Sequence, residues 1–150
     1  MSGNVAGQTD CASVRIERSA DVVFEFLSNP ENLDLWSFGT WKTSIASDGL
    51  VAGEGLHDGS KIFVRIYAHS EPRLVDFHVG ISADALQPRI FARVLPVVDA
   101  GDSSNACTLM MIATRTPEMN DQRWQRMQQV HAVEVDLIRS LIESGHDHRR

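Results

Sequence analysis

The chain has 150 residues, of which 43% are hydrophobic and 23% charged, so it is long enough for one globular domain with a buried core. Its 20 acidic and 14 basic residues give a net charge of −6, which argues against a nucleic-acid partner, because phosphates require a basic face. No apolar run approaches the roughly 20 residues needed to cross a bilayer, so no membrane insertion is expected. The N-terminal segment also lacks the basic start and apolar core of a secretory signal.

The two cysteines, Cys11 and Cys107, form no close-spaced redox or metal-ligand motif. Together with the missing secretory signal, this predicts free thiols in a reducing compartment. We therefore expect a soluble cytoplasmic protein, either a monomer or a homodimer. Residues 1–10 are expected to form a short disordered lead.

The first regular element expected is a strand over residues 12–18, where apolar and charged side chains alternate. Ser19 or Asp21 can then cap a helix whose apolar residues recur at helical spacing. This helix is expected to end at Asn29-Pro30, because the residue before a proline is pushed out of the helical region. A second short helix is predicted over residues 31–36.

From residue 39 to residue 115 the pattern changes to strands and turns. The strands follow one another without intervening helices, which favours an antiparallel meander. Residues 47–55 are interpreted as turns, and residues 99–105 as the loop that joins the last two strands. The predicted strands are 40–47, 61–69, 74–79, 89–98 and 107–115.

Two of these strands have clearly different faces. Alternation predicts an apolar inner face made of Ile62, Val64, Ile66, Ala68, Val75, Phe77 and Val79. Arg65, His69 and His78 fall on the opposite faces, where a solvated outer surface is the simplest interpretation. Arg89 and Arg93 lie on a strand whose two faces are both mixed, so the sequence does not orient them.

A final long helix is predicted from Asn120 or Asp121, either of which can cap it, to Ser144, where Gly145 stops it. The tail 146–150 is expected to be solvated. On a helical wheel, one wide apolar stripe contains Trp124, Met127, Val130, Leu137, Ile138, Leu141 and Ile142. Arg123 also falls on this stripe, but in the first turn, where it can reach solvent.

Two polar residues interrupt the stripe in the middle of the helix. Glu134 falls near its centre, and His131 lies three positions earlier, close enough to touch it. An ionised glutamate in an apolar site costs several kcal/mol without a partner, so Glu134 must be neutral, paired or in contact with water. It either lines a cavity or lies at the rim of the sheet in a salt bridge with a strand arginine, for which Arg89 and Arg93 are candidates.

The order of elements is a strand, two short helices, a run of strands and one long helix. Only the long helix is large enough to cover the apolar face of the sheet. We therefore predict an α+β fold, a curved antiparallel sheet wrapped around the C-terminal helix. Such an arrangement leaves a gap between sheet and helix, and gaps of this kind are natural ligand cavities.

The segment VRIERSADVVFEFLSNPENLDLW, residues 14–36, combines a strand, a polar cap, a helix, an Asn-Pro break and a tryptophan. With the long terminal helix, it resembles the START-like helix-grip (SRPBCC) superfamily, and within it the polyketide cyclase/dehydrase and lipid-transport group. The resemblance implies a single helix-grip ligand-binding domain over residues 11–145. It does not choose an activity, because the superfamily includes lipid carriers, aromatase/cyclases, hormone receptors, allergens and co-chaperones.

Three functions are compatible with these observations. The first is the binding of a small hydrophobic molecule, lipid-, aromatic- or polyketide-like, in a cavity under the terminal helix. The second is a cofactor-independent enzyme of the cyclase/dehydrase type, in which Glu134 and His131 transfer protons. The third is a co-chaperone-like interaction module with a small cavity.

The candidate ligand-binding residues are Trp36, Trp41, Val64, Ile66, Phe77, Met110, Ile112, Met127, His131 and Glu134. The tryptophans can serve either a pocket or the core, and the methionines are more simply core filler. Glu134 and His131 are too few to hold a metal ion, and the chain has no phosphate-cradling glycine loop or nucleophile elbow. No metal and no cofactor are therefore expected.

Overall fold

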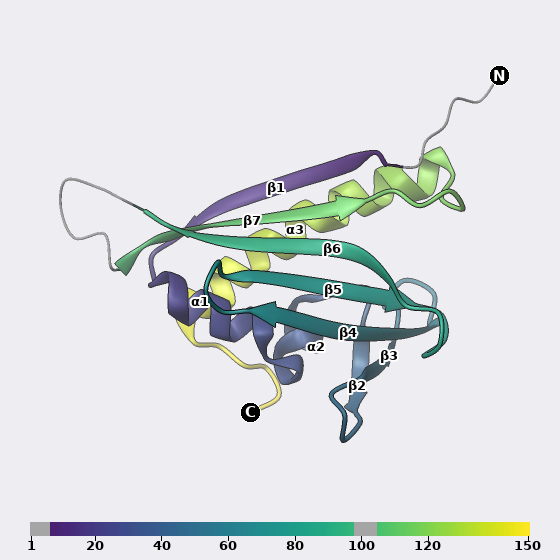
Figure 1. The fold of residues 1–150 in the computed structure, drawn as a ribbon, viewed down its shortest axis with the longest axis horizontal. Coiled ribbons are helices and arrows are strands. Elements are labelled where there is room, and N and C mark those ends of the chain that lie inside the picture. Colours follow the sequence, from purple (N-terminus) through teal and green to yellow (C-terminus); the bar gives the residue numbers. More distant parts are fainter. Residues whose placement is uncertain (1–6, 98–104) are drawn as a thin grey trace.

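The structure is a computed structural model that describes residues 7–97 and 105–150. Its elements follow the predicted order, with two short helices after the first strand and a long helix at the end (Figure 1). They are β1 (Thr9–Ile16), α1 (Ala20–Ser28), the short 3₁₀ helix η1 (Pro30–Asn32), α2 (Leu33–Trp36), β2 (Trp41–Ile45), β3 (Val51–Glu54), β4 (Lys61–His69), β5 (Leu74–Gly80), β6 (Gln87–Pro96), β7 (Cys107–Thr114) and α3 (Asp121–Ser144).

The helix ends are fixed by the side chains that the sequence offers for capping. Ser19 accepts a hydrogen bond from the backbone N–H of Val22 at 3.3 Å, and Asn120 accepts one from that of Arg123 at 2.8 Å. Helix α3 ends at Ser144 and is capped by Gly145, whose φ of 70° is the left-handed conformation that glycine adopts without steric cost. The predicted boundaries of this helix are therefore confirmed.

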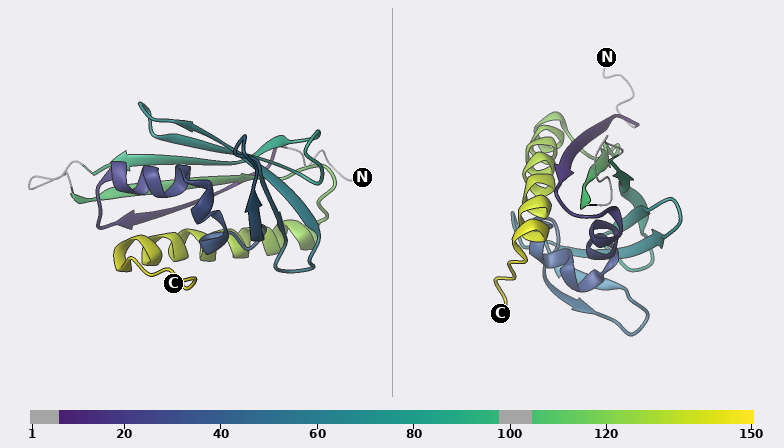
Figure 2. Two further views of the ribbon diagram at one scale, coloured as in Figure 1. Left: turned by 90° about the horizontal axis from the view of Figure 1, so that it is seen from below. Right: turned by 90° about the vertical axis from the view of Figure 1, so that its left-hand side faces the viewer.

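The seven strands form one antiparallel sheet in the order β1-β7-β6-β5-β4-β3-β2. Strands β2 to β7 are a meander, and β1 joins its far edge beside β7. The sheet curves, and α3 lies along its concave side, with α1 and α2 near one end (Figure 2). Helix α3 packs mainly on β1 and, less, on β7, so the middle of the sheet stands away from it.

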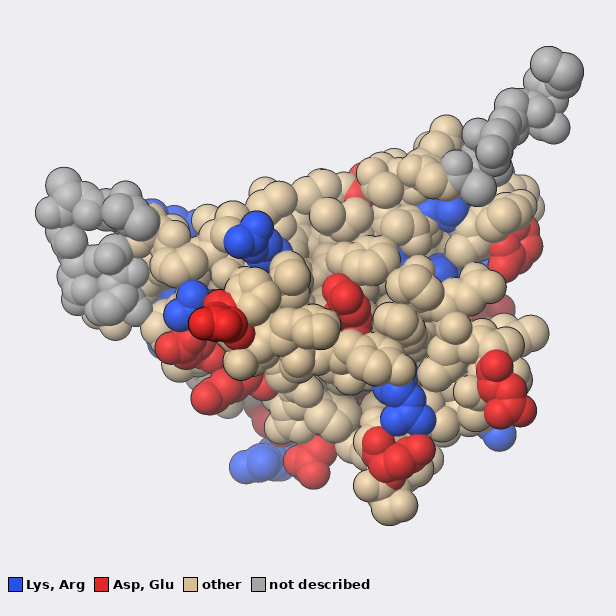
Figure 3. Space-filling model, viewed as in Figure 1, with Lys and Arg blue, Asp and Glu red and all other residues tan. Residues whose placement is uncertain are grey.

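Alternation places one side of the longer strands inside. On β7 the buried residues are Cys107, Leu109, Met111 and Ala113. The outer surface carries the polar residues predicted for it, since Arg65 pairs with Asp48 at 3.0 Å and the His78 ring lies against Tyr67. On the face seen in Figure 3, acidic and basic side chains are interspersed among neutral ones. No helix in the described part of the chain has the length and apolar character required to span a bilayer.

One strand was not predicted. Residues 47–55, interpreted as turns, contain β3. The pattern did not reveal this strand, because it is short, includes a glycine and shows little alternation. The glycine has a packing role: a Cβ on Gly53 would lie 2.8 Å from the carbonyl oxygen of Trp41 on β2. Close approach of the two backbones therefore requires glycine here.

The predicted ends of the domain also differ from the structure. Strand β1 begins at Thr9, so the expected disordered lead overlaps it, and residues 1–6 lie outside the described residues. The tail is not simply solvated, because Arg149 reaches back to Asp34 on α2 at 2.8 Å and to the carbonyl oxygen of Glu31 at 2.7 Å. Sequence periodicity does not report such a long-range ion pair. Most of the predicted loop 99–105 lies outside the described residues.

The buried face of α3 is rotated slightly from the predicted stripe. Its buried residues are Trp124, His131, Val135, Ile138 and Leu141. Val135, which the wheel left outside the stripe, packs in the core because the helix leans toward β1 at the edge of the sheet. Val133, on the opposite side, is 53% exposed.

This orientation makes a stability prediction. Ile138 is fully buried, so we expect Ile138→Ala to lower the free energy of unfolding by about 2–5 kcal/mol, from lost burial and the cavity left behind. The control is Val133→Ala on the exposed side of the same helix, for which a change within about 0.5 kcal/mol is expected. Urea unfolding followed by circular dichroism measures both, and equal losses would contradict the orientation.

Candidate functional site

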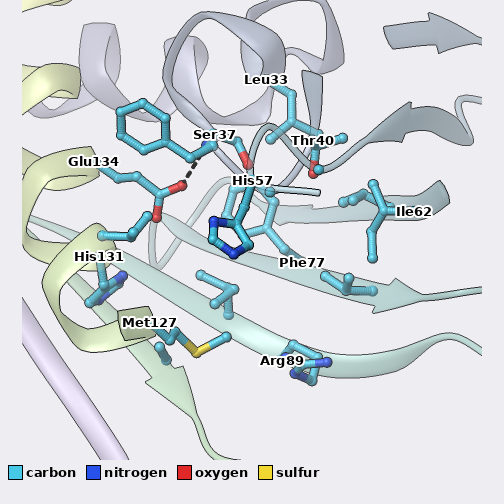
Figure 4. Close-up of a pocket in the computed structure, with 18 of the residues that line it drawn as sticks. Leu33, Ser37, Thr40, His57, Ile62, Phe77, Arg89, Met127, His131 and Glu134 are labelled. Carbon is cyan, nitrogen blue, oxygen red and sulfur yellow. Dashed lines mark hydrogen bonds between the residues drawn. The ribbon is translucent and has the colours of Figure 1, made fainter. Parts of the chain in front are cut away.

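A cavity of about 300 Å³ lies between α3, the α2–β2 segment and the inner face of the sheet (Figure 4). Its volume is at the lower end of the range of small-molecule sites. Most of its wall is apolar. The lining residues are Leu33, Trp36, Ser37, Phe38, Gly39, Thr40, Gly55, His57, Asp58, Ser60, Ile62, Val64, Phe77, Val79, Arg89, Ile90, Ala113, Arg123, Arg126, Met127, Val130, His131 and Glu134.

The interior of the cavity is built on an aromatic pair. The rings of Trp36 on α2 and Phe77 on β5 meet edge to face, with centroids 5.7 Å apart and planes at 78°. Both side chains are buried, as is Val64 on the neighbouring strand β4. Met127 adds a flexible, partly buried side chain from the helix. These groups form an apolar wall that suits a hydrophobic ligand.

Glu134 is the acidic group in this wall on the α3 side. Its Oε2 accepts a hydrogen bond from the backbone N–H of Phe38 at 2.9 Å, across the gap between α3 and the segment after α2. Burial raises the pKa of Glu134 to about 8, and the hydrogen bond from Phe38 opposes the rise only in part. The carboxyl group is therefore mostly protonated at neutral pH. Oε1 has no hydrogen-bond partner among the described residues, which leaves it for a ligand.

His131 is held by the sheet. Its Nε2 lies 2.7 Å from the carbonyl oxygen of Met111 on β7, and its side chain is 2% exposed. A carbonyl oxygen only accepts, so Nε2 carries the proton and donates it. The predicted contact between His131 and Glu134 does not occur as a hydrogen bond, because each residue bonds to a different neighbour of α3.

Arg89 lines the cavity because of an irregularity in the strand pairing of the sheet. The pairing of β5 with β6 shifts between Phe77 and His78, which oppose Ile90 and Pro88, so Arg89 is the extra residue of a β-bulge. The bulge turns Arg89 to the cavity side beside Ile90, whereas Arg93 is exposed on the outer side. Neither arginine forms the salt bridge with Glu134 that was one alternative.

The cavity meets solvent at one end. Apart from Gly39, the exposed residues among its lining come from the β3–β4 segment and from the first part of α3. They include His57, Asp58 and Ser60 on one side and Arg123 and Arg126 on the other. This end is therefore the mouth, and the Trp36–Phe77 pair lies deeper.

The structure brings together only part of the predicted site. The candidates that line the cavity are Trp36, Val64, Phe77, Met127, His131 and Glu134. Trp41 lies outside it on β2, 37% exposed, and Ile66 packs against the core farther along β4. Met110 and Ile112 lie on the outer side of β7, because the inner face is taken by the alternate residues that include Met111.

Several lining residues were not predicted as part of the site. A β-bulge leaves no trace in an alternating pattern, so Arg89 could not be oriented, and the turn residues His57 and Asp58 gave no signal. Arg123 had already been placed on the cavity-facing stripe. In the described part of the chain, no three His, Cys, Asp or Glu side chains are grouped as metal ligands would be.

Comparisons with known proteins identify the fold. No protein-family model and no curated protein sequence matches the chain. Among solved structures, an aromatase/cyclase, ZhuI, from a Streptomyces species matches with a TM-score of 0.69 and 13% identity, covering 95% of this chain and 97% of that one. Norcoclaurine synthase from Thalictrum matches with a TM-score of 0.56 and 16% identity, covering 92% of this chain and 95% of that one.

A START superfamily protein from Mycobacterium smegmatis also matches, with a TM-score of 0.55 and 11% identity over 93% of this chain and 97% of that one. The identities are low, so these likenesses show the fold alone. The chain has the START-like helix-grip fold, as its sequence predicted.

The raised pKa of Glu134 predicts how stability depends on pH. Below about pH 4.5 the carboxyl is protonated in both states. Between about 4.5 and 8 the unfolded chain releases the proton but the folded chain retains it, so the wild type loses up to about 1.4 kcal/mol of stability per pH unit. Glu134→Gln stays neutral throughout, and its amide oxygen can still accept from Phe38.

We therefore expect the stability of Glu134→Gln, relative to the wild type, to increase from about pH 5 to pH 8. Urea unfolding at several pH values measures this. Glu25→Gln, on the exposed side of α1, is the control that makes the same chemical change away from the cavity. A variant that is less stable than the wild type at all pH values would mean that Glu134 is ionised and structurally paired.

Proposed function

We propose that this protein binds a small hydrophobic molecule, lipid-, aromatic- or polyketide-like, in the cavity between the sheet and α3. The observation that carries the proposal is the position of the Glu134 carboxyl in the wall of an apolar cavity of about 300 Å³, where burial raises its pKa to about 8. A core built only for stability would fill this space and exclude the carboxyl group. The likeness to an aromatase/cyclase and to norcoclaurine synthase supports a small-molecule ligand.

The proposed contacts divide by chemistry. The apolar body of the ligand would lie on Trp36, Phe77, Val64 and Met127. Glu134, fixed through Oε2 on Phe38, would use its protonated carboxyl to donate to a carbonyl oxygen or to accept from a hydroxyl group. Such a polar group would fix the orientation of the ligand, while the apolar contacts supply most of the affinity.

A cyclase/dehydrase-type enzyme is the second candidate. Its support is the pKa of Glu134, which is close to neutral pH and so suits a group that gives and takes protons. In this reading Glu134 is the catalytic residue, and His131 positions the helix through Met111 instead of relaying a proton. The reaction would need no cofactor, because the cavity would orient a reactive chain and the carboxyl group would move its protons.

A larger side chain on α3 should fill the cavity. Val130 and Val133 lie on the same helix, but Val130 lines the cavity and Val133 is exposed. We expect Val130→Phe to weaken the binding of a neutral apolar dye, N-phenylnaphthylamine, by about tenfold or more because the ring occupies the ligand space. Val133→Phe, the control, should bind the dye like the wild type.

Dye fluorescence titration measures the affinity, and thermal unfolding checks that both variants are folded. Equal binding by both variants would place the dye outside the cavity. Absence of binding to the wild type would remove this class of ligand and favour the co-chaperone-like interaction module. If the protein is instead a cyclase/dehydrase-type enzyme, Glu134→Gln should abolish turnover of its substrate while the binding of the dye persists.

A further inference from the structure

Three arginines surround the mouth of the cavity. Arg89 comes from the bulge in β6, whereas Arg123 and Arg126 come from the first part of α3, one turn apart on the same side. All three line the same cavity, although more than 30 residues separate the strand arginine from the other two. The fold, and not their spacing in the sequence, therefore brings the three arginines together.

These arginines lack the partners that other arginines have. Arg65, Arg115 and Arg139 each form an ion pair with a carboxylate at 3.0 Å or less. Within the described residues, the guanidinium groups of Arg89, Arg123 and Arg126 form no ion pair and no hydrogen bond. The Nε atom of Arg89 is buried without an acceptor; so is that of Arg115, but the other nitrogens of Arg115 have partners and those of Arg89 have none. A buried donor without a partner costs folding free energy, so its retention points to an acceptor supplied from outside.

The charges around the mouth do not cancel. The pKa of Glu118 is lowered, first by its own backbone and to a lesser degree by the charges of Arg89 and Arg123. Asp58 faces Arg126, yet its carboxylate is engaged mainly by Ser60, whose hydroxyl lies 2.6 Å away. Burial, and then repulsion from Arg123, lower the pKa of Arg89. Three cations therefore face two carboxylates, and one of these, Asp58, is already hydrogen-bonded to Ser60.

We infer that the mouth formed by Arg89, Arg123 and Arg126 recognises an anionic oxygen group, a carboxylate or a phosphate, at the end of the bound ligand. Guanidinium groups match such groups because their N–H donors form a planar fork that meets two oxygens at once. The inference rests on the proposed function, since it places the apolar body of the same ligand on Trp36 and Phe77.

The two ends of the cavity are compatible with such an amphiphile. Arg89 is half-buried and can reach the ligand inside the mouth, whereas Arg123 and Arg126 are exposed and can close over the group at the rim. An ionised glutamate in the wall would repel an anion, but Glu134 is mostly protonated at neutral pH. The electrostatics of the cavity thus favour an anion at the mouth.

The test compares three probes with the same alkyl chain and different head groups: decanol, decanoate and decyl phosphate. Each is titrated against the protein loaded with N-phenylnaphthylamine, and displacement of the neutral dye gives the affinity. The variants are Arg89→Gln and its control Arg93→Gln, from the same strand but on the outer side. Arg89→Gln should fold, because it removes a half-buried charge that has no partner.

We expect the wild type to bind at least one of the two anions about tenfold more tightly than decanol, and Arg89→Gln to lose this preference without losing decanol binding. Arg93→Gln should retain it. The better of the two anions identifies the head group as carboxylate or phosphate. If Arg89→Gln does not fold, the exposed Arg126→Gln replaces it, with the same expected loss of preference.

Three results would overturn the inference, and they are distinguishable. Displacement by decanol and by both anions with equal affinity would leave the proposed function intact but reject the arginine mouth as an anion site. Failure of the dye and of all three probes to bind would reject the proposed function, and the inference with it. An equal loss in Arg89→Gln and Arg93→Gln would assign the preference to general charge.

Discussion

The cavity depends on how α3 is fixed to the rest of the protein. The helix buries its apolar side on β1 and β7, at one edge of the sheet, and two polar residues in its middle make bonds in different directions. His131 bonds to the carbonyl oxygen of Met111 on β7, and Glu134 bonds to the backbone N–H of Phe38 after α2. Together they hold the helix as a wall between the sheet edge and the short helices, and the space beneath the curved sheet is left open.

Several costly features occur together in this space. A cavity is left unfilled, a carboxyl group is placed where ionisation is unfavourable, and the buried Nε of Arg89 lacks an acceptor. Each of these lowers stability if considered alone. Their coincidence at one site, in a fold that otherwise satisfies its caps and strand pairings, is expected where function and not stability selects the residues.

The sequence predicted the parts of the fold that local chemistry controls. Caps such as Ser19 and Asn120, the break at Asn29-Pro30 and the faces of β4 and β5 follow from the residues themselves. The polar interruption of α3 also led to the site, since Glu134 lies in the cavity wall. These signals are local in the chain and therefore visible in it.

What the sequence did not reveal depends on contacts between distant segments. The bulge that turns Arg89 inward exists only in the pairing of β5 with β6, and the lean of α3 toward β1 decides the burial of Val135. The bond from His131 to Met111, which separates it from Glu134, joins residues on two elements. Met110 and Ile112 were assigned to the site because the sequence does not say which face of β7 meets the helix.

The most direct test of the account is native mass spectrometry of the purified protein, comparing the intact spectrum with the spectrum after denaturation. Ligand binding in the cavity predicts an intact mass that exceeds the mass of the chain by one small molecule, which is released on unfolding and is amphiphilic. Equal intact and denatured masses, both for the protein as purified and after incubation with hydrophobic compounds, would contradict the account and leave the cavity as a packing defect.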